Sequence, residues 1–192
     1  GRCLYAGRME NHASNPAGRL WLYFTEMAKQ PSNEGVNNHA AAYFGAHGFD
    51  ARYMRAMADL MQLPDEAAAM IPQILNSPIP AETLQRPLEA VRNYFRSDPL
   101  GTNPVNWMSQ QVGGVVLSEL NITSHMLNTV AQGPVIPEDV IEQIRVLASE
   151  IIDLAMADAG LDPDARAAFI QHAHRISEAA DLYKVTGPQR LV

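Results

Sequence analysis

The distribution of apolar and polar residues singles out residues 103–132. Glu119 is their only Asp, Glu, Lys or Arg, whereas charged residues are frequent on either side. A helix that faces water usually carries charges on its outer side, so we expect both faces of this segment to meet protein. At 100° per residue one arc holds its apolar positions, which are Val105, Met108, Val112, Val115, Val116, Leu120, Leu127 and Val130. We therefore predict a central helix here.

The other side of this predicted helix is polar but uncharged. Gln110, Gln111, Asn121 and His125 are candidates to bond neighbouring helices or to line a wet cavity, and both interpretations stay open. The tandem glycines at 113–114 each weaken a helix by roughly 1 kcal/mol relative to Ala. They indicate either a kink or a close approach of another backbone. The β-branched residues around 115–123 leave a strand as the alternative.

The rest of the chain also has helical patterns. Asn15 and Pro16 are a cap and a first-turn proline, although residues 15–18 could instead form a turn before a strand. Asp50 is placed to cap a further helix, and Pro72 predicts a break. The expected helices are one from Pro16, one over about 36–47, one after Asp50, a short one from Pro64 and one over about 80–97.

The last third predicts an antiparallel helical hairpin. Apolar residues spaced four and three apart form one half of its expected seam, namely Val140, Ile144, Leu147, Ile151 and Leu154. The facing half is Phe169, Ala173, Ile176, Ala180 and Tyr183. Asp162 and Pro163 restart the chain after a short turn, so the two helices must run antiparallel. The predicted fold is an all-α multi-helix bundle around a central uncharged helix, ending in this hairpin.

Length and composition set the outer limits. The 192 residues fit one helical domain over 15–187, with a flexible or non-native arm over 1–14 and a tail over 188–192. No apolar run approaches the roughly 18 residues of a membrane-spanning helix, so we expect no membrane partner. The single cysteine, Cys3, and the absence of a signal peptide indicate a cytoplasmic protein. A net charge of -7 makes nucleic acid an unfavourable partner.

Three segments carry a resemblance. They are ARAAFIQHAHRISEAADLYKVTG at 165–187, LPDEAAAMI at 63–71 and NPAGRL at 15–20. Together they resemble a group of bacterial helical proteins of unknown function, whose last helix tends to end in an isoleucine, a tyrosine and a glycine. Ile176, Tyr183 and Gly187 match those positions. The resemblance implies an all-helical bacterial protein and brings no catalytic residues with it.

Motifs for catalysis or metal binding are scarce. His172 and His174 are two residues apart, which places them on different faces of a helix, unlike the i, i+4 histidines of a zinc site. No Glu-x-x-His motif of a di-iron bundle occurs. We therefore expect no metal, no cofactor and no catalytic residue. Residues 39–60 leave a helix-turn-helix as an alternative, with Arg52 and Arg55 as its phosphate contacts.

Glu119 is the charged residue least suited to its surroundings. A buried carboxylate must take up a proton or find a cation, and the candidate cations are Arg92, Arg166 and His172. We expect an ion pair that orients helices, with an exposed Glu119 or a ligand-binding carboxylate as alternatives.

These patterns favour one class of function over another. Good packing and scarce chemistry point to a non-enzymatic interaction protein, an adaptor or antitoxin-like partner that forms a homo-oligomer or binds another chain. The alternative is a small-molecule-binding or catalytic bundle that uses Gln110, Gln111, Asn121 and His125.

Overall fold

The computed structural model describes residues 12–130 and 136–187, and every regular element in these two ranges is a helix. The predicted all-α fold is confirmed. The sequence analysis placed no boundary inside residues 15–187, but the chain divides into two compact units between residues 135 and 136. We call them unit 1 and unit 2 and describe each by itself.

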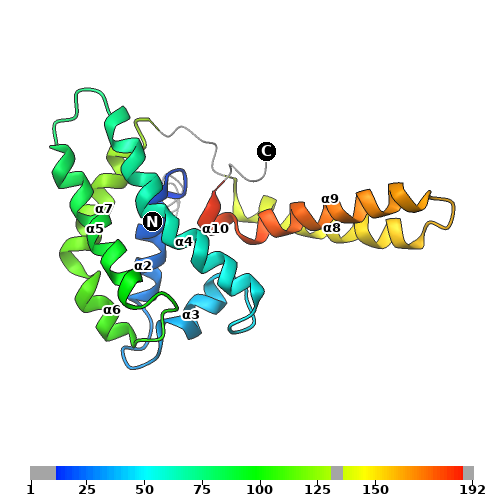
Figure 1. The fold of residues 1–192 in the computed structure, drawn as a ribbon, viewed down its shortest axis with the longest axis horizontal. Coiled ribbons are helices and arrows are strands. Elements are labelled where there is room, and N and C mark those ends of the chain that lie inside the picture. The colour runs from blue at the N-terminus through cyan, green and yellow to red at the C-terminus, as the bar shows by residue number, and fades with distance from the viewer. Residues whose placement is uncertain (1–11, 131–135, 188–192) are drawn as a thin grey trace, which may run out of the picture. The chain divides into compact units, whose positions relative to one another are not determined.

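Unit 1 is a bundle of packed helices (Figure 1). In chain order its elements are α2 (Pro16–Met27), α3 (Val36–Tyr43), α4 (Ala51–Met70), the 3-10 helix η1 (Ile71–Gln73), α5 (Ala81–Ser97), α6 (Val105–Gln111) and α7 (Gly114–Leu127). Helix α2 packs against α4 and α7, and α5 packs against the same two helices. These four helices therefore form the core of the unit.

Helix α2 lies at the centre of unit 1. Asn15 caps it by accepting a hydrogen bond from the Gly18 N–H at 2.9 Å, and Pro16 occupies its first turn, as the sequence predicts. Eight of its twelve residues are buried, among them Arg19, and this proportion shows that both sides of the helix meet protein. The turn-and-strand alternative for this segment is therefore wrong.

Residues 103–132 do not form one continuous helix, and the kink left open at the tandem glycines is confirmed. The segment forms two helices, α6 and α7, which separate at Val112 and Gly113. Gly114 has φ +33°, a left-handed conformation that favours glycine, and a Cβ at Gly113 would lie 2.0 Å from the Ser109 carbonyl oxygen. The two glycines therefore allow a sharp break at which the chain's own backbone approaches closely.

Helix α7 has one buried side and one side that is open in unit 1. Leu120, Thr123 and Leu127 are buried, and the Thr123 hydroxyl donates to the Leu84 carbonyl oxygen at 3.1 Å. Val115 and Ile122 are exposed. The expectation that both faces of this segment meet protein therefore does not hold within the described residues, although the segment has only one charged residue.

The two prolines near residue 70 behave differently. Pro64 does not begin a helix, because α4 continues through it to Met70. The Arg92 guanidinium donates to the Pro64 carbonyl oxygen at 3.2 Å. The break expected at Pro72 is confirmed, since α4 gives way there to η1. A buried proline is therefore compatible with this helix at one position, whereas the next proline ends it.

Unit 2 contains α8 (Glu138–Ala157), α9 (Pro163–Asp181) and the short α10 (Tyr183–Thr186). Helices α8 and α9 lie side by side along their length and form the predicted antiparallel hairpin (Figure 1). Asp162 caps α9 by accepting from the Asp164 and Ala165 N–H groups at 3.0 and 3.2 Å. At the other end, the Arg145 guanidinium donates to the Asp181 carboxylate at 2.9 Å.

The hairpin packs through alanines and Ile141 rather than through most of the predicted seam. Its buried side chains on α8 are Ile141, Ala148 and Ala155, at a spacing of seven, and those on α9 are Ala173 and Ala180. Of the predicted seam, Val140, Leu147, Ile151, Leu154, Phe169 and Ile176 are instead exposed. The seam prediction is therefore correct for Ala173, Ala180 and Tyr183, holds in part for Ile144, which packs against Ile141, Ala180 and Tyr183, and is wrong for these large residues.

The expected terminal segments are described only in part. Residues 1–11 of the arm and the tail at 188–192 lie outside the described residues. His12 and Ser14, at the end of the expected arm, bond to α7 instead.

Candidate interaction surface and polar sites

The polar residues expected to form one arc are placed on two helices. Gln110 and Gln111 are exposed on α6, and His125 is exposed on α7, where Asn121 is half-buried. The break at Gly113 separates the two pairs, so they do not line one common surface of a continuous helix. A cavity of about 440 Å³ in unit 1 is lined by other residues, namely Met61, Asp65, Arg92, Phe95 and Arg96.

Glu119 finds a cation, but not one that the sequence suggested. Arg86 on α5 forms an ion pair with it, and the Arg86 Nε lies 3.2 Å from Glu119 Oε2. This hydrogen bond raises the pKa of Arg86. The Glu119 side chain is 15% exposed and that of Arg86 is 65% exposed, so the pair lies at the surface of unit 1.

Replacing Glu119 with Gln should change the melting temperature of unit 1 little. An ion pair with one solvated partner contributes little to the free energy of unfolding. Water can hydrate Arg86 once its partner is removed. We expect a shift below about 3 °C, measured by tryptophan fluorescence, because Trp21 and Trp107 both lie in unit 1. A much larger loss would show that Arg86 depends on Glu119 for its solvation.

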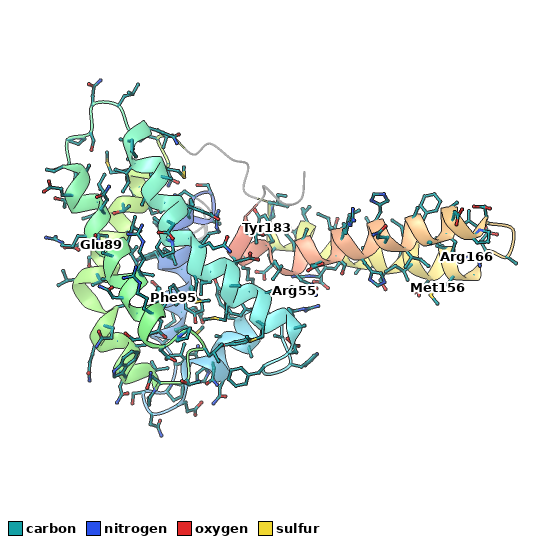
Figure 2. The ribbon with its side chains drawn as sticks, viewed as in Figure 1. Arg55, Glu89, Phe95, Met156, Arg166 and Tyr183 are labelled. Carbon is teal, nitrogen blue, oxygen red and sulfur yellow. The ribbon has the colours of Figure 1, made fainter. Side chains whose placement is uncertain are left out.

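The three cations proposed for Glu119 have other surroundings. Arg92 pairs with Asp65 at 2.7 Å on the neighbouring α4. Arg166 lies near the tip of the hairpin (Figure 2), where its Nη2 donates to the Asp158 carbonyl oxygen at 2.6 Å. His172 is exposed on α9. The first therefore stabilises the contact between α4 and α5, and the second closes the turn of the hairpin.

A buried polar cluster joins the start of α2 to α7. The His12 Nδ1 lies 2.9 Å from the Ser124 hydroxyl, and the Asn15 amide donates to the Asn128 Oδ1 at 2.6 Å. The His12 ring lies 4.3 Å from the ring of Trp21. Sequence reasoning missed this cluster, although Asn15 was recognised as a cap. Its function is structural, because its polar atoms satisfy one another across two helices.

The cluster should make the stability of unit 1 sensitive to acid. Burial lowers the pKa of His12 from 6.5 to about 4, and the nearby His125 adds to the shift. The unfolded chain therefore binds this proton at a higher pH than the folded chain, so stability should fall as the pH drops below 6.5. Between pH 7 and pH 5 the expected loss from this group is about 2 kcal/mol at most.

Urea unfolding followed by tryptophan fluorescence measures this loss. The His12→Asn variant removes the titrating group, so its free energy of unfolding should depend less on pH than that of the wild type over the same range. Equal pH dependence in both proteins would contradict the assignment.

Other functional motifs find little support in the described residues. Within 12–130 and 136–187 no three His, Cys, Asp or Glu side chains come together as a metal site. No helix in these ranges is long and apolar enough to cross a membrane. The connection between α3 and α4 covers residues 44–50, whereas a helix-turn-helix joins its helices by three or four residues. Arg52 donates to the Gly45 carbonyl oxygen at 2.8 Å within this connection.

The most extended exposed apolar surface in the described residues is a face of the hairpin. On α8, the large residues of the predicted seam lie about 40° to 120° to one side of the middle of the buried line through Ile141, Ala148 and Ala155. On α9, Phe169 and Ile176 are displaced in the same rotational sense from Ala173 and Ala180. We call this set the apolar face, and it consists of Val140, Ile144, Leu147, Ile151, Leu154, Phe169 and Ile176.

The two parts of this face lie on one side of the hairpin. Both helices are right-handed and run in opposite directions, so equal rotations from their shared buried line point to the same side. Six of the seven side chains are between 37% and 70% exposed, and Ile144 is half-buried.

The opposite side of the hairpin is mostly polar. Glu142, Ser149, Asp153, Gln171 and His174 project there and are exposed. Val146 and Met156 are exposed apolar residues outside the apolar face, and Figure 2 labels Met156 near the tip of the hairpin. The hairpin as a whole is thus amphipathic, with the apolar face on one side and mostly polar residues on the other.

Comparison with protein family models, curated proteins and solved structures found no match for the chain in any of the three.

Proposed function

We propose that this protein is a non-enzymatic helical interaction protein that binds another protein through the apolar face of the α8–α9 hairpin. The carrying observation is the exposure of Val140, Leu147, Ile151, Leu154, Phe169 and Ile176 on one side of two packed helices. Exposed apolar patches rimmed by polar residues are typical of interaction sites. A cytoplasmic location, expected from the single cysteine, is part of this proposal.

The energetics favour covering this face. Complete burial of a large aliphatic or aromatic side chain contributes about 1.5 to 3 kcal/mol, so covering six half-exposed ones should contribute roughly 1 kcal/mol each. The sum is comparable with the estimated 4 to 15 kcal/mol that association costs in lost freedom. A partner that buries a similar apolar surface of its own roughly doubles the favourable free energy, which makes stable binding feasible.

The chemistry of the partner follows from the shape and charge of the hairpin. Large apolar residues at spacings of four and three accept the side chains of another helix between them. Residues 136–187 contain four Lys or Arg against ten Asp or Glu, a balance that disfavours nucleic acid and anionic lipid. The partner is thus an amphipathic helical surface of a protein. The alternative small-molecule site is not carried forward, because its polar residues are separated and mostly exposed.

The test uses two adjacent residues with similar exposure that lie about 100° apart around α8. Leu147 lies on the apolar face and is 57% exposed, whereas Val146 lies off it and is 50% exposed. Tagged wild type, Leu147→Glu and Val146→Glu are each isolated from the native host and examined by native mass spectrometry. The bound protein, whether a copy of the chain or another chain, should be lost from the first variant and retained by the second.

Both other outcomes overturn the proposal. Equal retention by the two variants would show that binding does not use the apolar face. Isolation of the wild type with no bound protein would show that the face is not an interaction surface under these conditions.

A further inference from the structure

We infer that the protein covering the apolar face is a second copy of this chain, and that two hairpins form a four-helix bundle whose twofold axis runs parallel to the helices. In this arrangement α8 of each copy lies against α9 of the other. The inference rests on the proposed function, because it names the occupant of the same face.

The dimensions of the face fit a dimer. Helix α8 has 20 residues and α9 has 19, so the hairpin is about 30 Å long at 1.5 Å per residue. Two helices packed about 8 to 10 Å apart present a footprint roughly 18 Å wide. Two such faces bury more than the about 1,000 Å² in total that a specific interface needs.

A second hairpin also matches the pattern of the face. A twofold interface brings the same patch of each subunit together, so a row of large apolar residues meets a row of the same length and spacing. Two amphipathic hairpins packed face to face give the layout of a four-helix bundle, with the polar sides outward. No other described surface of the chain has this length of exposed apolar residues on paired helices.

The turn and the buried contacts set the level of each residue along the hairpin. Helix α8 ends at Ala157 where α9 begins at Pro163, and Ile141 packs with Ala180, so Arg175 lies at about the level of Val146. The Cα atom of Glu150 is therefore about four residues, or about 6 Å, nearer the tip of the hairpin than that of Arg175. Because side chains lean toward the N-terminus of their own helix, the Glu150 carboxylate and the Arg175 guanidinium lean toward each other's level.

These two residues carry opposite charges on opposite edges of the face. Glu150 is exposed beside Leu147 and Leu154, which lie three residues before it and four after it. Arg175 is exposed on α9 beside His172 and Ala179, on the edge away from α8. Each hairpin thus has an acidic group on its α8 edge and a basic group on its α9 edge at nearby levels.

This charge pattern selects one of two twofold arrangements. Rotation about an axis parallel to the helices preserves height and exchanges the edges, so Glu150 of each copy meets Arg175 of the other. Rotation about an axis across the helices instead places α8 on α8 and α9 on α9, which brings like edges together. Opposite charges at flanking positions set partner orientation in helical bundles, so the parallel axis is favoured.

The test begins with the mass of the purified full chain in solution. Sedimentation equilibrium should give a concentration-dependent dimer of the 21.1 kDa chain, and Leu147→Glu should abolish it while Val146→Glu retains it. Glu150→Arg and Arg175→Glu should each weaken dimerisation about 10-fold, because each puts like charges together at two symmetric places. The double variant should return to within about 3-fold of the wild type. Asp153→Arg, on the opposite side, is the control and should have no such effect.

A second variant set reads the orientation directly. In a Cys3→Ser background, the Glu150→Cys, Arg175→Cys double variant should form a covalent dimer with a short bismaleimide cross-linker, which spans the difference in height, and either single variant should not. Covalent dimers of the single variants, or a double charge variant no tighter than the single ones, would overturn the parallel axis.

Failure of the dimer can be distinguished from failure of the proposed function. If the wild type is a monomer in solution, a second copy of the chain does not cover the apolar face. If the host-isolated protein still carries a different chain that Leu147→Glu releases, the proposed function survives that failure.

Discussion

Replacing Phe24 with Ala should lower the free energy of unfolding of unit 1 by about 3 to 5 kcal/mol. Phe24 is fully buried on α2, and its ring lies 5.3 Å from that of Tyr94 and 5.7 Å from that of Phe95 on α5. The substitution leaves a cavity where three aromatic rings meet, and both their contacts and the transfer free energy of the removed atoms are lost. Urea unfolding followed by tryptophan fluorescence measures the change, since both tryptophans lie in unit 1.

Phe49 provides the matched control for this prediction. It is 55% exposed in the connection before α4, so Phe49→Ala should cost about 1 kcal/mol or less. If both variants lost the same free energy, α2 would not be the centre of unit 1.

Replacing Ala173 with Phe should destabilise unit 2 by about 3 kcal/mol, at the upper end for overpacking. Ala173 is 1% exposed and lies where α9 meets α8, so a larger side chain must force the helices apart. Ala167 lies on an exposed part of the same helix, and Ala167→Phe should have little effect. Hydrogen exchange of peptides covering residues 138–181 measures unit 2 separately from unit 1, and equal exchange in the two variants would contradict packing through small residues.

Local rules predicted much of the fold. Asn15 with Pro16, Asp50 and Asp162 each begin a helix in the structure, because capping depends on nearby backbone N–H groups. Pro72 ends α4 for an equally local reason. The exception is Pro64, which is buried inside α4. The tertiary environment of α4 outweighs the cost of its missing N–H.

The central helix was misassigned because lack of charge is an indirect sign of burial. Residues 103–132 contain a single charged residue, Glu119, yet Val115 is 72% exposed. Helix α2 contains Arg19, which the sequence would place at the surface, yet this residue is 2% exposed and lies 3.7 Å from Glu66. Which helix lies in the middle depends on contacts between distant segments, and the periodicity of one segment does not encode them.

In the hairpin, the large apolar stripe of α8 was predicted correctly, but it was wrongly expected to pack on α9. Large apolar residues at spacings of four and three do form one stripe on α8, as periodicity predicts. The same helix carries a second stripe of Ile141, Ala148 and Ala155, and this smaller one packs on α9. Small side chains let two helices approach closely, which leaves the larger stripe for another surface.

The candidate polar sites were predicted least well. Glu119 pairs with Arg86, a residue distant in sequence that no local rule connects to it. The hydrogen bond between His12 and Ser124 likewise joins the first and last described segments of unit 1, which are far apart in the sequence. Periodicity places residues on a face, but it does not tell which residue of another helix lies opposite.

Hydroxyl-radical footprinting tests the central claim that the apolar face is covered by protein. Wild type and Leu147→Glu are labelled at the same concentration, chosen so that the wild type is associated. Phe169 and Ile151, on the face, should be oxidised more slowly in the wild type than in the variant, whereas Met156 and Val146, outside it, should react equally in both. Equal oxidation of Phe169 in the two proteins would show that the face stays open to water, and would contradict the account.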